Sequence, residues 1–405
     1  MIDGSSIGGD ACARTTRPTA AGTFACELHR SQFLRVCGNG DRTLTVHRTR
    51  TPIDGFATEA HLLGRLLSLA LASHRRLVVA SDWISHYAPC HGASCSSSCA
   101  HTLGCIWRTV TGCITNASTA DRHGDRLGEL SQTSAGYGIA EVASNSKYFS
   151  TKLYGSMKDV SLDMYAPAAA AAQPSAGPAD VVAQWERLRG RFWVRGMLQS
   201  FLWRPTADVQ ARVNAHPAMD VLREIGDAPF IAFHIRLTDN DRDFLSGFGR
   251  NGSVTRSFER YMAFADAIRS RHSRRALHHI FVATDSVLAY YEAKQSRWRN
   301  AGWVVHANPS VPRATTAAKR NWFRSSRSRE LENVMVDVEA LRRASFLVGS
   351  FQSNIYRLGA ELNTAYHETN LTSMPEQAER QRGFAAQLNP LQRIFTVDVE
   401  WYEDP

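Results

Sequence analysis

Three short apolar segments in the second half of the chain each end in polar residues suited to binding an anionic ligand. The segments cover 230–239, 279–286 and 346–354. Their polar residues are His234, Arg236, Asp239, Asp285, Ser350, Ser353 and Asn354. Because ligands of open parallel α/β sheets bind outside the carboxyl ends of the strands, we expect these side chains to form one site.

The residue types at these strand ends predict a diphosphate ligand. Arg236 carries a planar, permanently charged guanidinium group that matches two phosphate oxygens. Ser353 precedes a predicted helix over 354–362, and the free N–H groups of a helix N-terminus bind anions. Together they predict a site that holds the two phosphates of a nucleotide.

Each of these residues also has a purely structural interpretation. Asp285 and Ser353 could each cap the helix that follows. Arg236 alone could form a surface ion pair, and His234 could be a structural residue of the strand. Asp337 lies in a predicted helix beside apolar neighbours, and its low helix propensity favours a functional reason for its place.

Length, composition and charge indicate a soluble two-domain protein with an anionic ligand. At 405 residues, two domains of ordinary size are expected. All but five of the 47 basic residues are Arg, which reflects either a GC-biased genome or attraction to an anion. No basic block is interleaved with aromatic residues, so nucleic-acid binding is not expected. No apolar run is long enough for a transmembrane helix, and we expect no membrane anchor in this chain.

The cysteines are confined to the first part of the chain, at positions 12, 26, 37, 90, 95, 99, 105 and 113. Their even number favours disulfides in an oxidising compartment. Five of them crowd into 90–113, where His91 and His101 make a zinc site the competing interpretation. No Cys-x-x-Cys pair is present, which disfavours zinc.

The second half alternates strands and helices, which predicts a parallel, doubly wound sheet. The expected strands are 229–236, 278–284, 302–306 and 345–350, and the expected helices are 256–271, 286–296, 329–344 and 354–362.

The first half predicts a second α/β layer. A helix opening at Gly55-Phe56 and a strand from Leu77 follow a possible first strand at 43–47. We expect Trp185, Trp193 and Trp203 to be core residues rather than a sugar-stacking face. The predicted division is an irregular leader at 1–44, an acceptor-side domain at 45–220 with a low-complexity insertion at 166–178, a nucleotide-sugar-binding domain at 221–385, and a tail at 386–405.

Three motifs together resemble those of the α1,6-fucosyltransferase and protein O-fucosyltransferase superfamily. Residues 234–239, His-Ile-Arg-Leu-Thr-Asp, resemble its His-x-Arg-x-Thr-Asp signature. Residues 281–285 resemble its second motif, and 337–354 resemble its third, a helix led by Asp and a strand followed by Ser and Asn. Gly55 resembles the start of its Gly-rich helix motif. Three motifs in order on predicted strand ends are fairly specific.

The resemblance implies a GT-B-like fold of two facing Rossmann-type domains with parallel sheets. It implies an inverting transfer of L-fucose from GDP-fucose to a glycan or protein hydroxyl, without a metal or other cofactor. The enzyme would work in the lumen of the secretory pathway, in the Golgi or ER, with a cytosolic location as the alternative.

The resemblance also assigns roles to individual residues. Arg236 would bridge the diphosphate and stabilise the leaving GDP, and Ser353 would bind the β-phosphate. Asp337 would bind guanine, and His234 the nucleotide or fucose. The remaining assignments are Asp285 in the nucleotide pocket, Asp239, Ser350, Asn354 and Gly55 in substrate binding, and Asp241 or Asp243 as the base for the acceptor.

Departures from the family pattern leave alternatives open. Leu237 stands where many α1,6-transferases carry a second Arg, which leaves room for a protein O-fucosyltransferase-like branch. One alternative is a GT-B enzyme that uses another nucleotide sugar. Another is an inactive relative that binds a sugar or protein, and a zinc-binding module at 90–113 is a distant third.

Overall fold

The computed structural model divides the chain into two compact units, Met1–Asp208 and Val209–Pro405. The residues it describes are 20–33, 43–47, 56–72, 76–79, 85, 87, 103–108, 111, 124–125, 138–141, 181–236, 257–272, 277–310, 327–351, 353–370 and 390–397. Along the sequence, this division falls ahead of the boundary predicted at 220. Helix α8 (Pro217–Ile225), which follows this junction, packs against α14 (Arg327–Arg343) of the second unit. The other predicted domain limits stay predictions.

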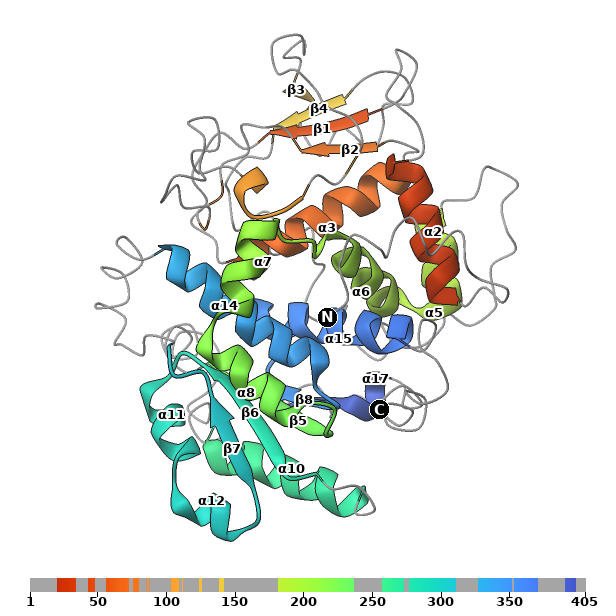
Figure 1. Ribbon diagram of the computed structural model, residues 1–405. Helices are drawn as coiled ribbons and strands as arrows, with labels where there is room; N and C mark the ends of the chain where they lie inside the picture. The colour runs from red at the N-terminus through yellow and green to blue at the C-terminus, as the bar shows by residue number, and fades with distance from the viewer. Residues whose placement is uncertain are drawn as a thin grey trace, which may run out of the picture. The chain divides into compact units, whose positions relative to one another are not determined.

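The second unit is built on a five-stranded parallel sheet (Figure 1). Its order is β7 (Val304–Ala307), β6 (His279–Thr284), β5 (Phe230–Ile235), β8 (Phe346–Gly349) and β9 (Ile394–Thr396). Every neighbouring pair is parallel. The predicted strands are confirmed. The C-terminal tail was expected to be separate, but its residues 394–396 form the edge strand beside β8.

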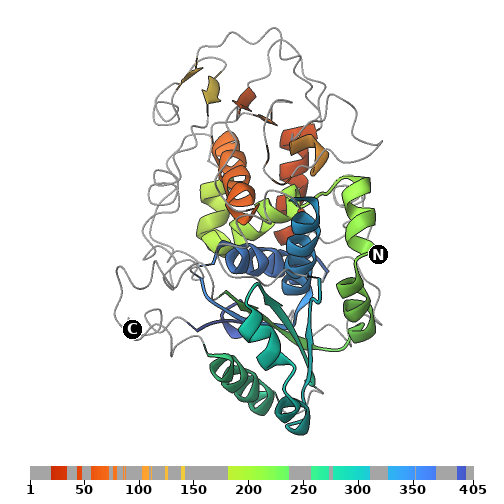
Figure 2. The same cartoon turned by 90° about the vertical axis from the view of Figure 1, so that its left-hand side faces the viewer.

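Helices cover both faces of this sheet, as in a doubly wound fold. On one face, alternate strand residues such as Phe233 and Val282 form a core with α10 (Phe258–Arg271) and α11 (Val287–Ala293). Helix α14 packs against β5 and β6 and also against α15 (Asn354–Asn370). These two blue helices lie side by side in Figures 1 and 2.

Two predicted helices of this unit differ in extent from the structure. The helix expected over 286–296 is two helices, α11 and α12 (Ser296–Asn300). The helix expected over 354–362 continues to Asn370 because buried residues such as Leu362 and Ala365 extend its apolar face. The short α17 (Pro390–Arg393) leads into β9.

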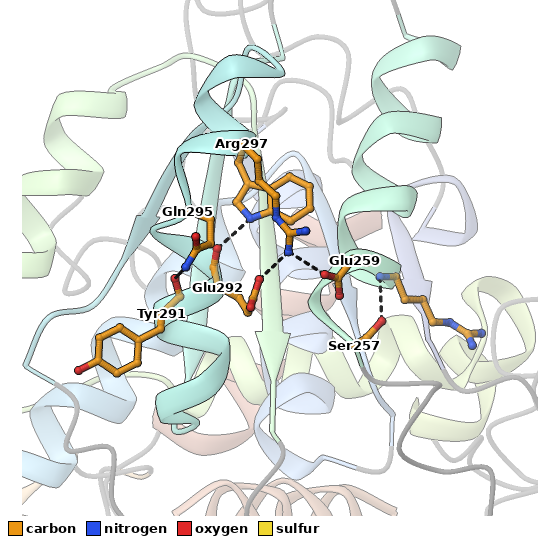
Figure 3. Close-up of polar contacts among 8 residues, drawn as sticks. Ser257, Glu259, Tyr291, Glu292, Gln295 and Arg297 are labelled. Atoms are coloured by element: carbon orange, nitrogen blue, oxygen red, sulfur yellow. Dashed lines mark hydrogen bonds and ion pairs between the residues drawn. The ribbon is translucent and has the colours of Figure 1, made fainter.

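An exposed ion-pair cluster joins three helices of the second unit. Arg297 of α12 contacts Glu259 of α10 at 2.7 Å and Glu292 of α11 at 2.6 Å, as Figure 3 shows. Because these side chains face solvent, the pairs contribute little to stability. They make Arg297 a useful control position for substitutions of other Arg residues.

The first unit has a four-stranded parallel sheet in the order β2 (Arg76–Val79), β1 (Thr43–His47), β4 (Gly138–Glu141) and β3 (Gly124–Asp125). Its described helices are α2 (Ala20–Phe33), α3 (Phe56–Ala72), α5 (Val181–Arg189), α6 (Arg191–Leu202) and the 3-10 turn η2 (Leu103–Cys105). Helix α7 (Ala207–Asn214) spans the point in the sequence where the two units divide. Helices α5 and α6 are separated by Gly190, whose φ of 85° favours glycine.

The leader predicted to be irregular contains helix α2, and this helix belongs to the core. Phe24 is fully buried and packs against Trp185 and Trp193 with ring centroids 5.5 Å from each. Trp203 packs against Trp107, with ring centroids 5.1 Å apart. Trp193 is therefore a core residue, as predicted, whereas Trp185 and Trp203 are half-buried and pack against buried tryptophan rings.

Two of the cysteines, Cys26 and Cys105, are disulfide-bonded. The cysteine pairing across the whole chain stays a prediction, and Cys90, Cys95 and Cys99 lie outside the described residues. Within the described part of the chain, no helix is both long and apolar enough to span a membrane.

Candidate functional site

The register of the second sheet brings three of the predicted strand ends together. Phe233 of β5 pairs with Val282 of β6 on one side and with Val348 of β8 on the other. Arg236 and Asp285 therefore follow the carboxyl ends of adjacent strands. Ser350 and Ser353 follow the end of β8 at the same edge and are both buried.

His234 lies at the centre of this edge, on the middle strand. Its side chain is 7% exposed, and burial together with the charge of Arg236 lowers the pKa of its imidazole to about 4, against an opposing effect of Asp285. Both charged residues thus lie close to His234. The ring is neutral at neutral pH, and its buried Nδ1 atom has no hydrogen-bond partner among the described residues.

Tyr356 and Gly349 shape the wall beside His234. The Tyr356 ring lies against the His234 ring with centroids 6.3 Å apart and donates a hydrogen bond from its hydroxyl to the carbonyl of Phe395. A Cβ atom at Gly349 would come within 2.3 Å of the Tyr356 ring. Only glycine at this position allows Tyr356 to pack where it does.

Helix α11 is capped by Ser286, so the capping interpretation of Asp285 is wrong. The Ser286 hydroxyl accepts a hydrogen bond of 3.3 Å from the N–H of Ala289. Asp285, one residue earlier, lies close enough to His234 for its charge to raise the pKa of that imidazole.

Ser353 stands at the start of α15 but does not cap it with its side chain. Its backbone N–H donates to Ser350 O at 3.0 Å, and its carbonyl accepts from the N–H of Arg357 at 3.0 Å. The buried Oγ atom has no hydrogen-bond partner within the described residues. The adjacent Asn354 accepts a hydrogen bond from Arg357 through Oδ1. A buried hydroxyl that no neighbour engages is a candidate ligand-binding group.

Asp337 lies farther along the same edge, beside the end of β7. Its Oδ1 accepts a hydrogen bond of 3.4 Å from Nδ2 of Asn308, which directly follows that strand. Two strand spacings separate β7 from β5, or about 10 Å. Asn308, which the sequence analysis did not single out, is fully buried. A polar residue two positions after the predicted strand 302–306 was the available signal.

The remaining predicted site residues lie outside the described residues: Gly55, Asp239, Asp241 and Asp243. Their roles stay predictions. Among the described residues, no group of three or more His, Cys, Asp or Glu side chains is arranged to hold a metal ion.

Both units hold a parallel sheet, and polar groups gather at the carboxyl edge of the second one, where open parallel α/β sheets bind their ligands. The family described as "Alpha-(1,6)-fucosyltransferase N- and catalytic domains" matches residues 167–374, just over half of the chain. The chain belongs to this family, so the resemblance inferred from its sequence is confirmed. The parallel sheets confirm the predicted α/β class.

Several solved fucosyltransferases overlap with the structure over most of its length. FUT1 of Arabidopsis thaliana, solved as a mutant with GDP, is 10% identical, with 87% of this chain and 75% of that chain covered and a TM-score of 0.41. Fucosyltransferase NodZ of Bradyrhizobium is 13% identical, with 79% and 93% covered and a TM-score of 0.39. POFUT1 in complex with GDP-fucose is 11% identical, with 80% and 95% covered and a TM-score of 0.36. No curated protein matches the sequence significantly.

Proposed function

We propose that this chain is an inverting fucosyltransferase that transfers L-fucose from GDP-fucose to a hydroxyl group of a glycan or glycoprotein. The family supports a glycosyltransferase of this type. The donor, the inversion and the acceptor class are the proposed part.

One observation carries the proposal: the carboxyl edge of the second sheet holds a cation and two buried polar atoms with no hydrogen-bond partner among the described residues. The cation is Arg236, and the atoms are His234 Nδ1 and Ser353 Oγ. Buried polar atoms that lack partners cost free energy, so a ligand that pairs with them is favoured. A diphosphate supplies acceptors for the Ser353 hydroxyl, the N–H groups at the start of α15 and the Arg236 guanidinium.

The reaction places specific demands on these groups. The acceptor oxygen attacks C1 of fucose, the bond from C1 to the β-phosphate oxygen breaks, and GDP leaves with the bonding electrons. The acceptor proton passes to a base, for which Asp241 and Asp243 are the candidates. Negative charge grows on the departing diphosphate, where Arg236 stabilises the transition state more than the ground state.

The neutral state of His234 fits this scheme. A second full charge beside Arg236 would be costly in a buried site, whereas a neutral imidazole can donate one hydrogen bond from a ring nitrogen to the nucleotide or fucose. Asp285, on the other side, offsets part of the charge of Arg236 and would keep the empty site from being strongly cationic.

The proposal includes metal independence, because Arg236 and the start of α15 supply the positive charge that a divalent cation supplies in other glycosyltransferases. It also places the protein in the secretory pathway lumen, in the Golgi or ER. The family and the disulfide-bonded Cys26 and Cys105 support an oxidising compartment.

Thermal stabilisation by nucleotides tests the donor site. Melting would be followed with GDP, UDP and CMP, each with and without EDTA. We expect a selective upward shift with GDP that EDTA leaves unchanged. An equal shift with UDP would indicate another nucleotide sugar, and no shift with any nucleotide would refute the donor site. Binding of GDP without turnover of GDP-fucose on any glycan or protein acceptor would indicate an inactive relative.

A further inference from the structure

A chain of buried hydrogen bonds connects helix α8 to Asp337. It begins at His216, the residue before α8, and passes through Asn333 of α14 and Asn308 after β7. These three side chains are buried, with exposures of 8%, 3% and 0%. Three polar side chains taken out of water together are costly unless each is satisfied, so their arrangement requires a reason.

The direction of each hydrogen bond follows from the backbone around the chain. His216 Nδ1 accepts a bond of 3.2 Å from the N–H of Ala218, so the neutral ring carries its proton on Nε2. That nitrogen donates to Asn333 Oδ1 at 3.1 Å. The Asn333 amide is held in this orientation because its Nδ2 donates to Ser310 O at 3.4 Å.

Asn308 is oriented in the same way. Its Oδ1 accepts a bond of 3.0 Å from the N–H of Ser310, which turns its Nδ2 toward Asn333 Oδ1 and Asp337 Oδ1. Asp337 Oδ1 is therefore held by the Asn308 amide, which cannot rotate because both its oxygen and its nitrogen are hydrogen-bonded. Asp337 itself is only partly buried.

We propose that His216 and Asn308 are positioning residues that hold the Asp337 carboxylate for recognition of the edge of a guanine base. This inference rests on the proposed function, which places guanine at Asp337. Guanine presents two donors on one edge, N1–H and the 2-amino group, and a carboxylate pairs with both only when its plane is correctly turned. The chain from α8 supplies that constraint.

His216 also caps helix α8, and a control variant can separate this capping role from its hydrogen bond to Asn333. It is the N-cap residue of α8, a role in which Asn is as effective as other preferred caps. His216→Asn therefore keeps an acceptor for the N–H of Ala218, but its shorter side chain cannot reach Asn333. His216→Ala loses both roles.

The experiment compares GDP with inosine diphosphate, which lacks the 2-amino group. Dissociation constants for both would be measured by calorimetry on the full chain and on Asp337→Asn, Asn308→Ala, His216→Asn and His216→Ala. A general loss of folded protein weakens the apparent binding of both ligands equally. A misplaced Asp337 instead reduces the preference for GDP over inosine diphosphate.

We expect the unaltered protein to prefer GDP by at least about tenfold and Asp337→Asn to lose this preference. Asn308→Ala should reduce it by about tenfold, and His216→Asn by about threefold at near-normal thermal stability. His216→Ala should reduce both preference and stability.

Three results would overturn the inference, and they are distinguishable. An unchanged preference in Asn308→Ala and His216→Asn, with its loss in Asp337→Asn, would leave the base site intact and remove the positioning role. Equal binding of the two ligands by the unaltered protein would remove base reading by Asp337 but keep a diphosphate site. No binding of either would refute the proposed function, and the inference with it.

Discussion

The hydroxyl of Thr284 donates a 2.6 Å hydrogen bond to the carbonyl oxygen of Ile235 and so joins the last residues of β6 and β5. The Thr284 hydroxyl oxygen in turn accepts a bond of 3.0 Å from the N–H of Ser286, the cap of α11. One side chain therefore holds the strand ends that carry Arg236 and Asp285. Thr284 belongs to a motif of the sequence but was not predicted as a site residue.

Replacement of Thr284 tests this connection. Thr284→Val keeps a buried, β-branched side chain of similar shape but leaves Ile235 O and Ser286 N without their partner. We expect a loss of about 1–3 kcal/mol in the free energy of unfolding, measured by urea denaturation, and weaker GDP binding. Thr284→Ser keeps the hydroxyl and should retain GDP affinity. Equal GDP affinity in the Thr284→Val and wild-type proteins would show that the Thr284 hydroxyl does not hold the strand ends in place for GDP.

Arg236 is expected to act mainly in the transition state. Arg236→Ala should reduce kcat with GDP-fucose by about a hundredfold, because one preplaced cation opposite the leaving group is removed. Arg297→Ala is the matched control, since it removes an equal charge from exposed ion pairs. Near-normal turnover in Arg236→Ala would exclude the proposed role, and equal losses in both variants would point to general charge effects.

The serines at the starts of α11 and α15 should behave differently. Ser353→Ala removes a hydroxyl that makes no hydrogen bond among the described residues, so stability should change by less than about 0.5 kcal/mol while GDP binding weakens about tenfold. Ser286→Ala removes a cap, so stability should fall by about 1 kcal/mol while GDP binding is kept. Melting curves with and without GDP measure both. The reverse pattern would make Ser353 a structural residue.

His234 should make stability depend on pH. Burial lowers the pKa of its imidazole from 6.5 to about 4 in the folded protein, so the unfolded chain binds more protons between these values. Its contribution is fully present above pH 6.5 and decreases by up to about 3 kcal/mol as the pH falls toward 4. Urea denaturation between pH 4 and 7.5 should show a steeper decline for the wild type than for His234→Asn. Parallel curves would mean that His234 is protonated or solvated in the fold.

The α/β class and the strands of the second unit were predictable because buried parallel strands are short apolar runs between amphipathic helices. Local periodicity did not predict the break between α11 and α12, the edge strand β9 or helix α2. The helix predicted as a single element over 286–296 breaks after Ala293, and β9 is only three residues long, too short to show a pattern. Helix α2 was missed because it is a partner for Trp185 and Trp193, which are far away in the chain.

The residue types at the strand ends predicted an anion site at Arg236, Asp285 and Ser353, because ligands of open parallel α/β sheets bind outside the carboxyl ends of the strands. The order of the strands was not readable from the sequence, since β8 lies beside β5 only through a long crossover. The hydrogen-bond partners of these side chains could not be predicted from the sequence either. Whether Ser286 or Asp285 caps α11, and whether Asn308 and His216 reach Asp337, depends on contacts among residues far apart in the chain. Only the packed tertiary structure brings these side chains within bonding distance, so it alone decided which of these polar groups cap helices and which bond to one another.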